Sequence, residues 1–185
     1  MKVTKTEIPG LLVVQPDVFS DSRGFFFESF SKKKYEDLGI QGVFVQDNFS
    51  CSKKNTVRGL HYQVGEKAQG KLCQVIEGEV LDVAVDIRFN SPTFGKHFSL
   101  ILSSETKLQL WIPVGFAHGF SVLSDEALFS YKCTNYYSKA HERAIIFNDP
   151  DLSIDWKVKE TIVSEKDLVA SKFKAIEKDF FYKQD

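Results

Sequence analysis

The stretch KLCQVIEGEVLDVAVDI, residues 71–87, decides the fold class. From Leu81 to Ile87 an apolar residue stands at every second position, as expected of a strand with one buried face. Glu77–Gly78 separates this run from the apolar run Leu72–Ile76, and this spacing predicts a β-hairpin. The period of two therefore indicates antiparallel strands rather than a helix.

The same rhythm of short strands continues on both sides of this stretch. Between Leu11 and Phe147, short apolar or alternating runs are broken by turn residues, and no long helical period intervenes. Roughly ten strands in one domain predict an all-β sandwich, jelly roll or closed barrel, and periodicity does not choose among them. Two short peripheral helices are expected: Ser31 would cap Lys32–Leu38 before Gly39, and Ser164 would cap a helix containing Asp167.

Length and composition predict one globular domain over residues 1–185. The chain is 43% hydrophobic and 26% charged, which excludes disorder, and no repeat or linker divides it. Its net charge of -1 provides no global field for nucleic acid or an anionic membrane surface. We therefore expect neither nucleic acid nor membrane as a partner.

Cysteine usage and the absence of a long apolar run predict a cytoplasmic location. The three cysteines, Cys51, Cys73 and Cys133, are an odd number without a CxxC pair, which is typical of reduced thiols. The apolar run Leu11–Val14 is too short for a signal peptide, and no window reaches the ~18 apolar residues that span a bilayer.

Three polar clusters could carry chemistry. In Arg58–Gln63, strand alternation would direct His61 and Gln63 away from Arg58 and toward a cavity. Gly115–Phe120 contains His118 between glycines, and Tyr131–Tyr137 could offer a proton donor and a flat ring on one face of a continuous strand. Each cluster also has a purely structural interpretation, as a hydrogen-bonded buried histidine or as core tyrosines with a wet edge.

The charged candidates are more scattered, and surface charges of this kind are usually solvated. Asp167 has a further structural interpretation, because Ser164 stands three residues before it in a capping box. The remaining charged candidates are Arg23, Glu28, Lys71, Glu142 and Lys166.

A catalytic metal is not expected. Gln63 stands where a second ligand would follow His61, and the four histidines show no i, i+2 or i, i+4 pair. We therefore expect no metal and no other cofactor.

Nine phrases in register give a more specific signal. The chain resembles the dTDP-4-dehydrorhamnose 3,5-epimerase family from about residue 5 to 170 through the phrases DSRGFFFE (21–28), VQDN (45–48), RGLHYQ (58–63), QGKL (69–72), SPTFGK (91–96), LWIP (110–113), GFAHGF (115–120), YKCTNYY (131–137) and SEKD (164–167).

The resemblance implies a cupin-type jelly-roll barrel, no metal, and a homodimer in which the N-terminal segment reaches the neighbouring active site. It implies a nucleotide 4-keto sugar as substrate, with inversion at C3 and C5. His61 would be the base, Asp167 its carboxylate partner, Lys71 the cation beside the ketone oxygen, and Tyr131 the proton donor. Substrate contacts are implied at Arg23, Phe26, Glu28, Gln46, Asp47, Asn48, Arg58, His118, Tyr137, Glu142 and Lys166.

Four rival functions stay open on sequence grounds. The fold would equally support a binder of nucleotide sugars without catalytic activity, or an oxidative metal enzyme. A single-centre epimerase or a ketoisomerase would use similar enolate chemistry.

Overall fold

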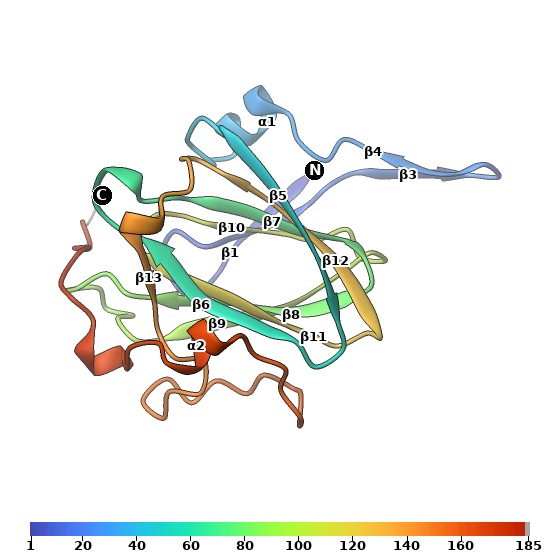
Figure 1. Cartoon of the computed structure of the whole chain (residues 1–185). Coiled ribbons are helices and arrows are strands. Elements are labelled where there is room, and N and C mark those ends of the chain that lie inside the picture. The colour runs from blue at the N-terminus through green and yellow to red at the C-terminus, as the bar shows by residue number, and fades with distance from the viewer. Residues whose placement is uncertain (184–185) are drawn as a thin grey trace.

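The computed structural model describes residues 1–183, which form two antiparallel sheets that face each other (Figure 1). The six-stranded sheet has the order β1-β2-β10-β7-β12-β5, from β1 (Lys2–Lys5), β2 (Leu12–Gln15), β5 (Gln46–Lys53), β7 (Lys71–Glu77), β10 (Gln109–Ile112) and β12 (Glu126–Cys133). The five-stranded sheet has the order β13-β6-β11-β8-β9, from β6 (Val57–Gln63), β8 (Glu79–Asp86), β9 (His97–Ser103), β11 (Phe116–Val122) and β13 (Glu142–Ala144).

The prediction of an all-β fold with short peripheral helices is confirmed. The helices are α1 (Lys32–Asp37) and α2 (Glu165–Leu168), with short 3-10 turns at Gly65–Lys67, Lys139–His141 and Phe173–Ala175. Ser31 occupies the N-cap position of α1, but its side chain makes no capping bond; Gly39 follows the helix with φ +88°. The Ser164 side chain does cap α2, accepting from the backbone N–H of Asp167.

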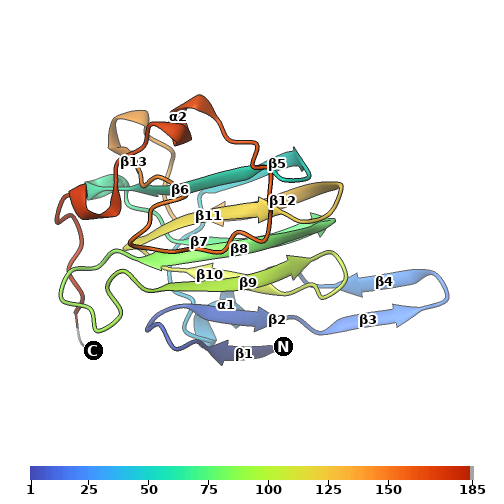
Figure 2. The ribbon, with the colours of Figure 1, turned by 90° about the horizontal axis from the view of Figure 1, so that it is seen from below.

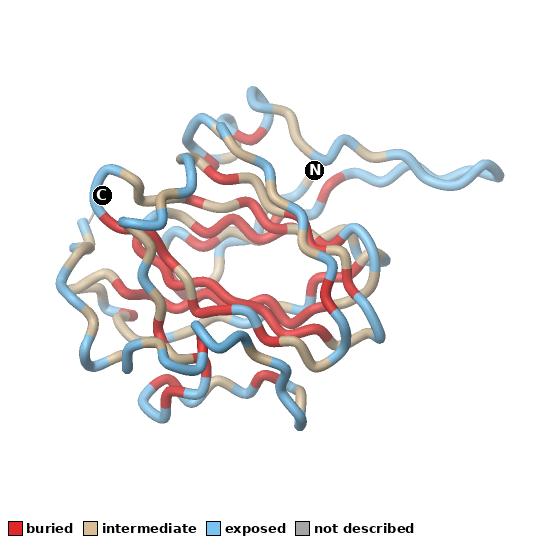
Figure 3. Tube along the Cα trace, in the orientation of Figure 1, coloured by how far each residue is buried: buried red, intermediate tan, exposed pale blue. Residues whose placement is uncertain are grey.

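Apolar side chains between the sheets form the core. Phe120 and Phe129 stack there with ring centroids 4.3 Å apart, one from each sheet. Figure 3 shows buried residues along both sheets, while the surrounding loops are largely exposed. The two sheets thus hold an inner layer of side chains to which both contribute.

Part of the outer face of each sheet is covered as well. Tyr35 of α1 packs with Trp111 over the six-stranded sheet. The segment after β13 crosses the outer face of the five-stranded sheet, where Trp156 and Phe147 pack against Val83 and Val85 (Figure 2).

This outer layer corrects one expectation. β8 was expected to bury only the apolar face from Leu81 to Ile87, but every residue of β8 except Glu79 is buried. The apolar set lies under the C-terminal segment, so the alternate set, which includes Asp82 and Ala84, faces the space between the sheets. The predicted alternation along β8 was correct, but it did not show which face of the strand lies between the two sheets.

The predicted hairpin at Glu77–Gly78 is wrong. β7 and β8 join different sheets, so this turn is a corner between layers rather than a hairpin. A β-carbon on Gly78 would lie 2.2 Å from the Glu126 carbonyl oxygen, which explains the glycine. The sequence signal for a tight turn is the same for a hairpin within one sheet and for a corner between two sheets.

A hairpin of β3 (Val18–Asp21) and β4 (Gly24–Phe27) extends away from the two sheets (Figures 1 and 2). Its large apolar side chains are open to solvent in the single chain: Phe19 is 65% exposed and Phe26 70%. Nowhere in residues 1–183 is a helix long and apolar enough to cross a bilayer.

Candidate active site

A histidine–carboxylate pair joins β6 to α2. His61 Nε2 lies 2.6 Å from Asp167 Oδ1, and the Asp167 side chain is almost fully buried. Burial alone would raise the pKa of Asp167, but hydrogen bonds from His61 and the Ser164 cap outweigh it and hold that pKa below its usual range. The capping box is therefore real, yet the carboxylate is directed at His61.

A β-bulge brings Arg58 to the same side as His61. In the pairing of β6 with β11, His61 faces His118 and Arg58 faces Phe120, so Gly59 and Leu60 together oppose the single residue Gly119. The extra residue reverses the alternation, and both side chains line one cavity of about 150 Å³. The expectation that Arg58 points away from His61 was therefore wrong.

The opposite wall comes from the six-stranded sheet. Tyr131 of β12 pairs with Cys73 of β7, and Lys71 lies two residues before Cys73 on the same face. The Lys71 ammonium lies 5.8 Å from the centre of the Tyr131 ring. Burial raises the pKa of Tyr131 to about 12, which keeps the phenol protonated at neutral pH.

A chain of polar contacts surrounds the adjoining cavity of about 140 Å³. The Tyr137 hydroxyl donates to Glu142 at 3.2 Å, and the Lys166 ammonium donates to the other Glu142 oxygen at 2.7 Å. The Tyr137 backbone N–H donates to the Gln46 side chain, which in turn donates to Asn48. β12 ends at Cys133, so Tyr131 and Tyr137 do not share the continuous strand that we expected.

His118 forms the inner wall of the cavity. It is 6% exposed, and its Nε2 lies 2.6 Å from Asp82 Oδ1. Burial lowers the pKa of His118 in spite of the Asp82 carboxylate, which favours the neutral imidazole.

The two cavities share His61, Lys71 and Tyr131 and together form the candidate active site. Five predicted substrate-contact residues do not line it within one chain. One of them, Lys166, borders an adjoining cavity together with Arg58, His61 and Asp167. Arg23 and Phe26 lie on the β3–β4 hairpin, where Arg23 pairs with Asp21. Glu28 pairs with Lys34, and Asp47 pairs with Lys132.

The cavities also contain residues that the sequence did not identify. Gln69 and Cys133 line the cavity beside Tyr137. Gln63 lines the same cavity as His61, as the alternation along this strand predicted. No local signal marks Asp82 as the partner of His118, since it is an alternating polar residue in an apolar strand.

The arrangement provides what proton transfer beside a ketone needs. A neutral histidine with its Nε2–H donated to a carboxylate leaves Nδ1 free to accept a proton. A lysine and a tyrosine on the other sheet could stabilise a developing oxyanion and return a proton.

Comparison with known proteins identifies relatives over nearly the whole chain. The family model described as dTDP-4-dehydrorhamnose 3,5-epimerase matches residues 5–175. The dTDP-4-dehydrorhamnose 3,5-epimerase of Shigella flexneri is 54% identical over 98% of this chain and 99% of its own length.

Solved structures agree with this result. The crystal structure of the dTDP-6-deoxy-D-glucose-3,5-epimerase of Legionella pneumophila in complex with dTDP-4-keto-L-rhamnose is 50% identical, covers 99% of both chains and has a TM-score of 0.95. The dTDP-4-dehydrorhamnose 3,5-epimerase of Elizabethkingia anophelis is 54% identical, covers 94% of this chain and 97% of its own, and has a TM-score of 0.90. The predicted cupin-type barrel is thereby confirmed.

Proposed function

Because the chain belongs to the dTDP-4-dehydrorhamnose 3,5-epimerase family, we propose that His61, Lys71, Tyr131 and Asp167 carry out its epimerisation. The enzyme converts dTDP-4-dehydro-6-deoxy-D-glucose to dTDP-4-dehydro-L-rhamnose by inverting C3 and C5. Both carbons adjoin the C4 ketone, so one set of residues can act on each in turn.

Each inversion requires one proton to leave and another to arrive from the opposite side. Nδ1 of His61 takes the proton from carbon, and the C–H electron pair moves through the new C=C bond onto the ketone oxygen. The Lys71 ammonium stabilises this enolate oxygen. The Tyr131 phenol then delivers a proton to the other face, and exchange with solvent restores both side chains.

One observation carries this proposal: His61, which contacts Asp167, lines one cavity from one sheet, and Lys71 and Tyr131 line the same cavity from the other sheet. A base and an acid on one wall could only remove and return a proton on the same face. Groups on opposing walls supply the geometry that inversion demands.

The polar residues around the cavity would hold the nucleotide. The Arg58 guanidinium is suited to a diphosphate, and the exposed Tyr137 ring can stack on thymine. The Tyr137–Glu142–Lys166 contacts would fix that ring beside the sugar.

We also propose a homodimer in which the β3–β4 hairpin completes the partner's site. Phe19, Phe25 and Phe26 are each more than half exposed on an element that projects from its own chain. Exposed apolar patches of this kind mark interfaces. Docking of the hairpin would bury them and could bring Arg23, whose side chain is 88% exposed, toward a neighbouring cavity.

The free cysteines support a cytoplasmic location. Cys51, Cys73 and Cys133 are all unpaired, as in proteins of reducing compartments.

The test is solvent-proton exchange followed by NMR. The protein is incubated in deuterated water with dTDP-4-dehydro-6-deoxy-D-glucose, and a reductase traps the product. We expect deuterium at C3 and C5 and trapping as dTDP-L-rhamnose. Deuterium at only one carbon would indicate a single-centre epimerase. Movement of the ketone from C4 to C3 would indicate a ketoisomerase, and no exchange at either carbon would indicate a binder without catalytic activity.

The His61→Ala variant separates catalysis from binding. It should lose exchange at both carbons while still binding dTDP in calorimetry. Retained turnover would exclude His61 as the base.

A further inference from the structure

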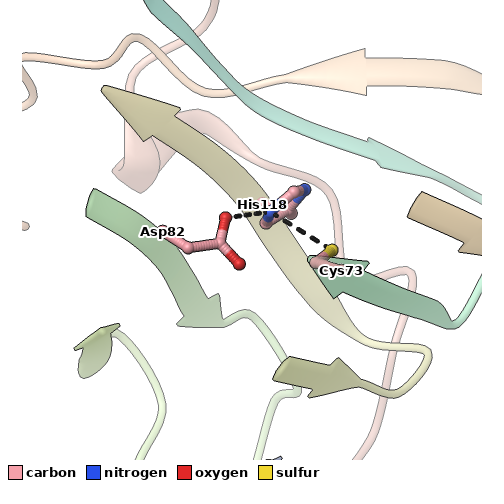
Figure 4. A group of neighbouring side chains, drawn as sticks. All are labelled: Cys73, Asp82 and His118. Atoms are coloured by element: carbon pink, nitrogen blue, oxygen red, sulfur yellow. Dashed lines mark hydrogen bonds and ion pairs between the residues drawn. The ribbon is translucent and has the colours of Figure 1, made fainter. Parts of the chain in front are cut away.

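A second cluster of reactive side chains lies behind the active-site cavity, on one strand of the six-stranded sheet and two paired strands of the five-stranded sheet. Cys73 comes from β7, Asp82 from β8 and His118 from β11 (Figure 4). All three are buried, and one ligand atom from each lies within 4.8 Å of the others. The sequence did not indicate this group, because its members are separated by nine and thirty-six positions.

Two potential ligands converge on one ring nitrogen. His118 Nε2 lies 2.6 Å from Asp82 Oδ1 and 3.8 Å from Cys73 Sγ. A single proton on Nε2 can be shared well with only one of them, whereas a metal ion would bind all three. The second Asp82 oxygen is buried and has no hydrogen-bond partner among the described residues. An unpartnered buried carboxylate oxygen is costly, and a cation would relieve that cost.

We propose that Cys73, Asp82 and His118 form a binding site for a thiophilic divalent cation such as Zn²⁺, and that occupation of this site inhibits the epimerase. Zn²⁺ takes thiolate, imidazole and carboxylate ligands about 2.0–2.3 Å away in tetrahedral geometry. Binding would therefore lengthen the 2.6 Å contact between His118 Nε2 and Asp82 Oδ1 and bring Cys73 Sγ slightly closer to His118. His118 borders the cavity, so the fourth position can be reached from there.

The charges balance in the bound state. Binding removes the thiol proton of Cys73 to solvent, and the imidazole stays neutral with its proton on Nδ1. One thiolate, one carboxylate and a dication sum to zero, as a fully buried site requires.

Positive groups nearby limit the affinity. Lys71, Arg58 and His61 line the same cavity as His118, and the Lys71 ammonium repels an incoming dication. The short distance between the bound cation and the active-site cavity also explains inhibition. A bound cation would withdraw His118 from the substrate and alter the field around Lys71, and this part of the inference rests on the proposed function.

The experiment measures metal binding directly. Chelator-treated protein is dialysed against ZnCl₂, and separately titrated with Co²⁺ while the thiolate-to-cobalt absorption is followed. We expect one equivalent of Zn²⁺, and a cobalt–thiolate band. Cys73→Ser should abolish the band and weaken Zn²⁺ binding at least about tenfold.

Matched variants keep the test decisive. Cys133→Ser and Cys51→Ser change the other two thiols and should retain the metal and the band. If Cys73→Ser folds poorly, Asp82→Asn removes the carboxylate, keeps all thiols and should weaken binding to a similar degree. Unchanged Zn²⁺ affinity in both variants, or no binding by the wild-type protein, would overturn the inference.

Turnover supplies the second readout. Zn²⁺ should slow the wild-type enzyme, and a chelator should restore it. Turnover by the metal-free protein tests the proposed function by itself, so a failure there is distinguishable from a failure to bind Zn²⁺.

Discussion

His61 Nε2 lies 2.6 Å from Asp167 Oδ1, although 106 positions separate the two residues in the chain. The Ser164 cap fixes the helix that presents Asp167, and β6 presents His61. The carboxylate therefore sets both the orientation of the ring and the nitrogen that carries its proton.

Asp167→Asn should lower kcat by roughly 10²–10⁴ with little effect on KM, because the amide can keep the contact but cannot stabilise the imidazolium. Steady-state kinetics with the reductase-coupled assay measures this. The control is Asp155→Asn, which alters an exposed aspartate paired with Lys157 and should leave kcat unchanged. An equal rise in KM at constant kcat would assign Asp167 to substrate binding instead.

Lys71→Met should reduce kcat by roughly 10²–10³, the usual loss when an oxyanion donor is removed. The methionine keeps most of the side-chain volume, and the charge alone is lost. Lys54→Met, which removes an exposed lysine paired with Asp125, should have no effect. The kcat and the rate of deuterium exchange should fall together, because the enolate itself becomes harder to form. Exchange at the wild-type rate would exclude Lys71 as the group that stabilises the enolate oxygen.

Tyr131→Phe should separate exchange from inversion. The phenol is the proposed donor, whereas His61 still removes the proton, so deuterium should enter the substrate while conversion to the inverted sugar falls by roughly 10²–10⁴. NMR of recovered substrate and trapped product measures both quantities. A parallel loss of exchange and conversion would mean that Tyr131 also stabilises the enolate.

Asp86→Asn should destabilise the fold by about 3–5 kcal/mol, because it breaks a buried ion pair with Arg88. The fully buried Asp86 carboxylate also accepts from Ser91 and Thr93. Burial would raise the pKa of Asp86, but these bonds outweigh it and hold the pKa below its usual range.

A depressed pKa in the folded state contributes stability above the unfolded value of about 3.9 and loses it as the pH falls through the folded value. The gap in urea-unfolding free energy between Asp86→Asn and the wild type should therefore be widest at neutral pH and narrow below about pH 4. If the difference in unfolding free energy did not vary with pH, the loss of stability in Asp86→Asn would result from altered packing and not from loss of the ionised carboxylate.

Mixed dimers should reveal the hairpin exchange. His61→Ala and Arg23→Ala chains are each expected to be impaired as homodimers. In a mixed dimer, the chain with intact His61 would receive an intact Arg23 from its partner. Mixing equal amounts after reversible dissociation should restore about a quarter of the wild-type rate. No recovery, with mixed dimers verified by mass spectrometry, would place Arg23 at the site of its own chain.

The predicted strands were mostly correct because alternation is a local property of the pleated backbone. The Glu77–Gly78 corner was not predictable, since a tight turn has the same local sequence whether the next strand pairs with the last or joins a second sheet. The direction of the Arg58 side chain was predicted wrongly because a β-bulge depends on the residues of the paired strand, here Gly119 of β11.

The sequence by itself determined the β-rich class, the short helices and, through its motif phrases, the family and the residues that could act. Those features reside in neighbouring residues and their order. Only the tertiary structure decided which residues meet: His61 with Asp167, His118 with Asp82 and Cys73, and His61 facing Tyr131 across two sheets. The physical reason is that these contacts depend on how distant strands pack, and a local pattern carries no record of the face that a later segment will cover.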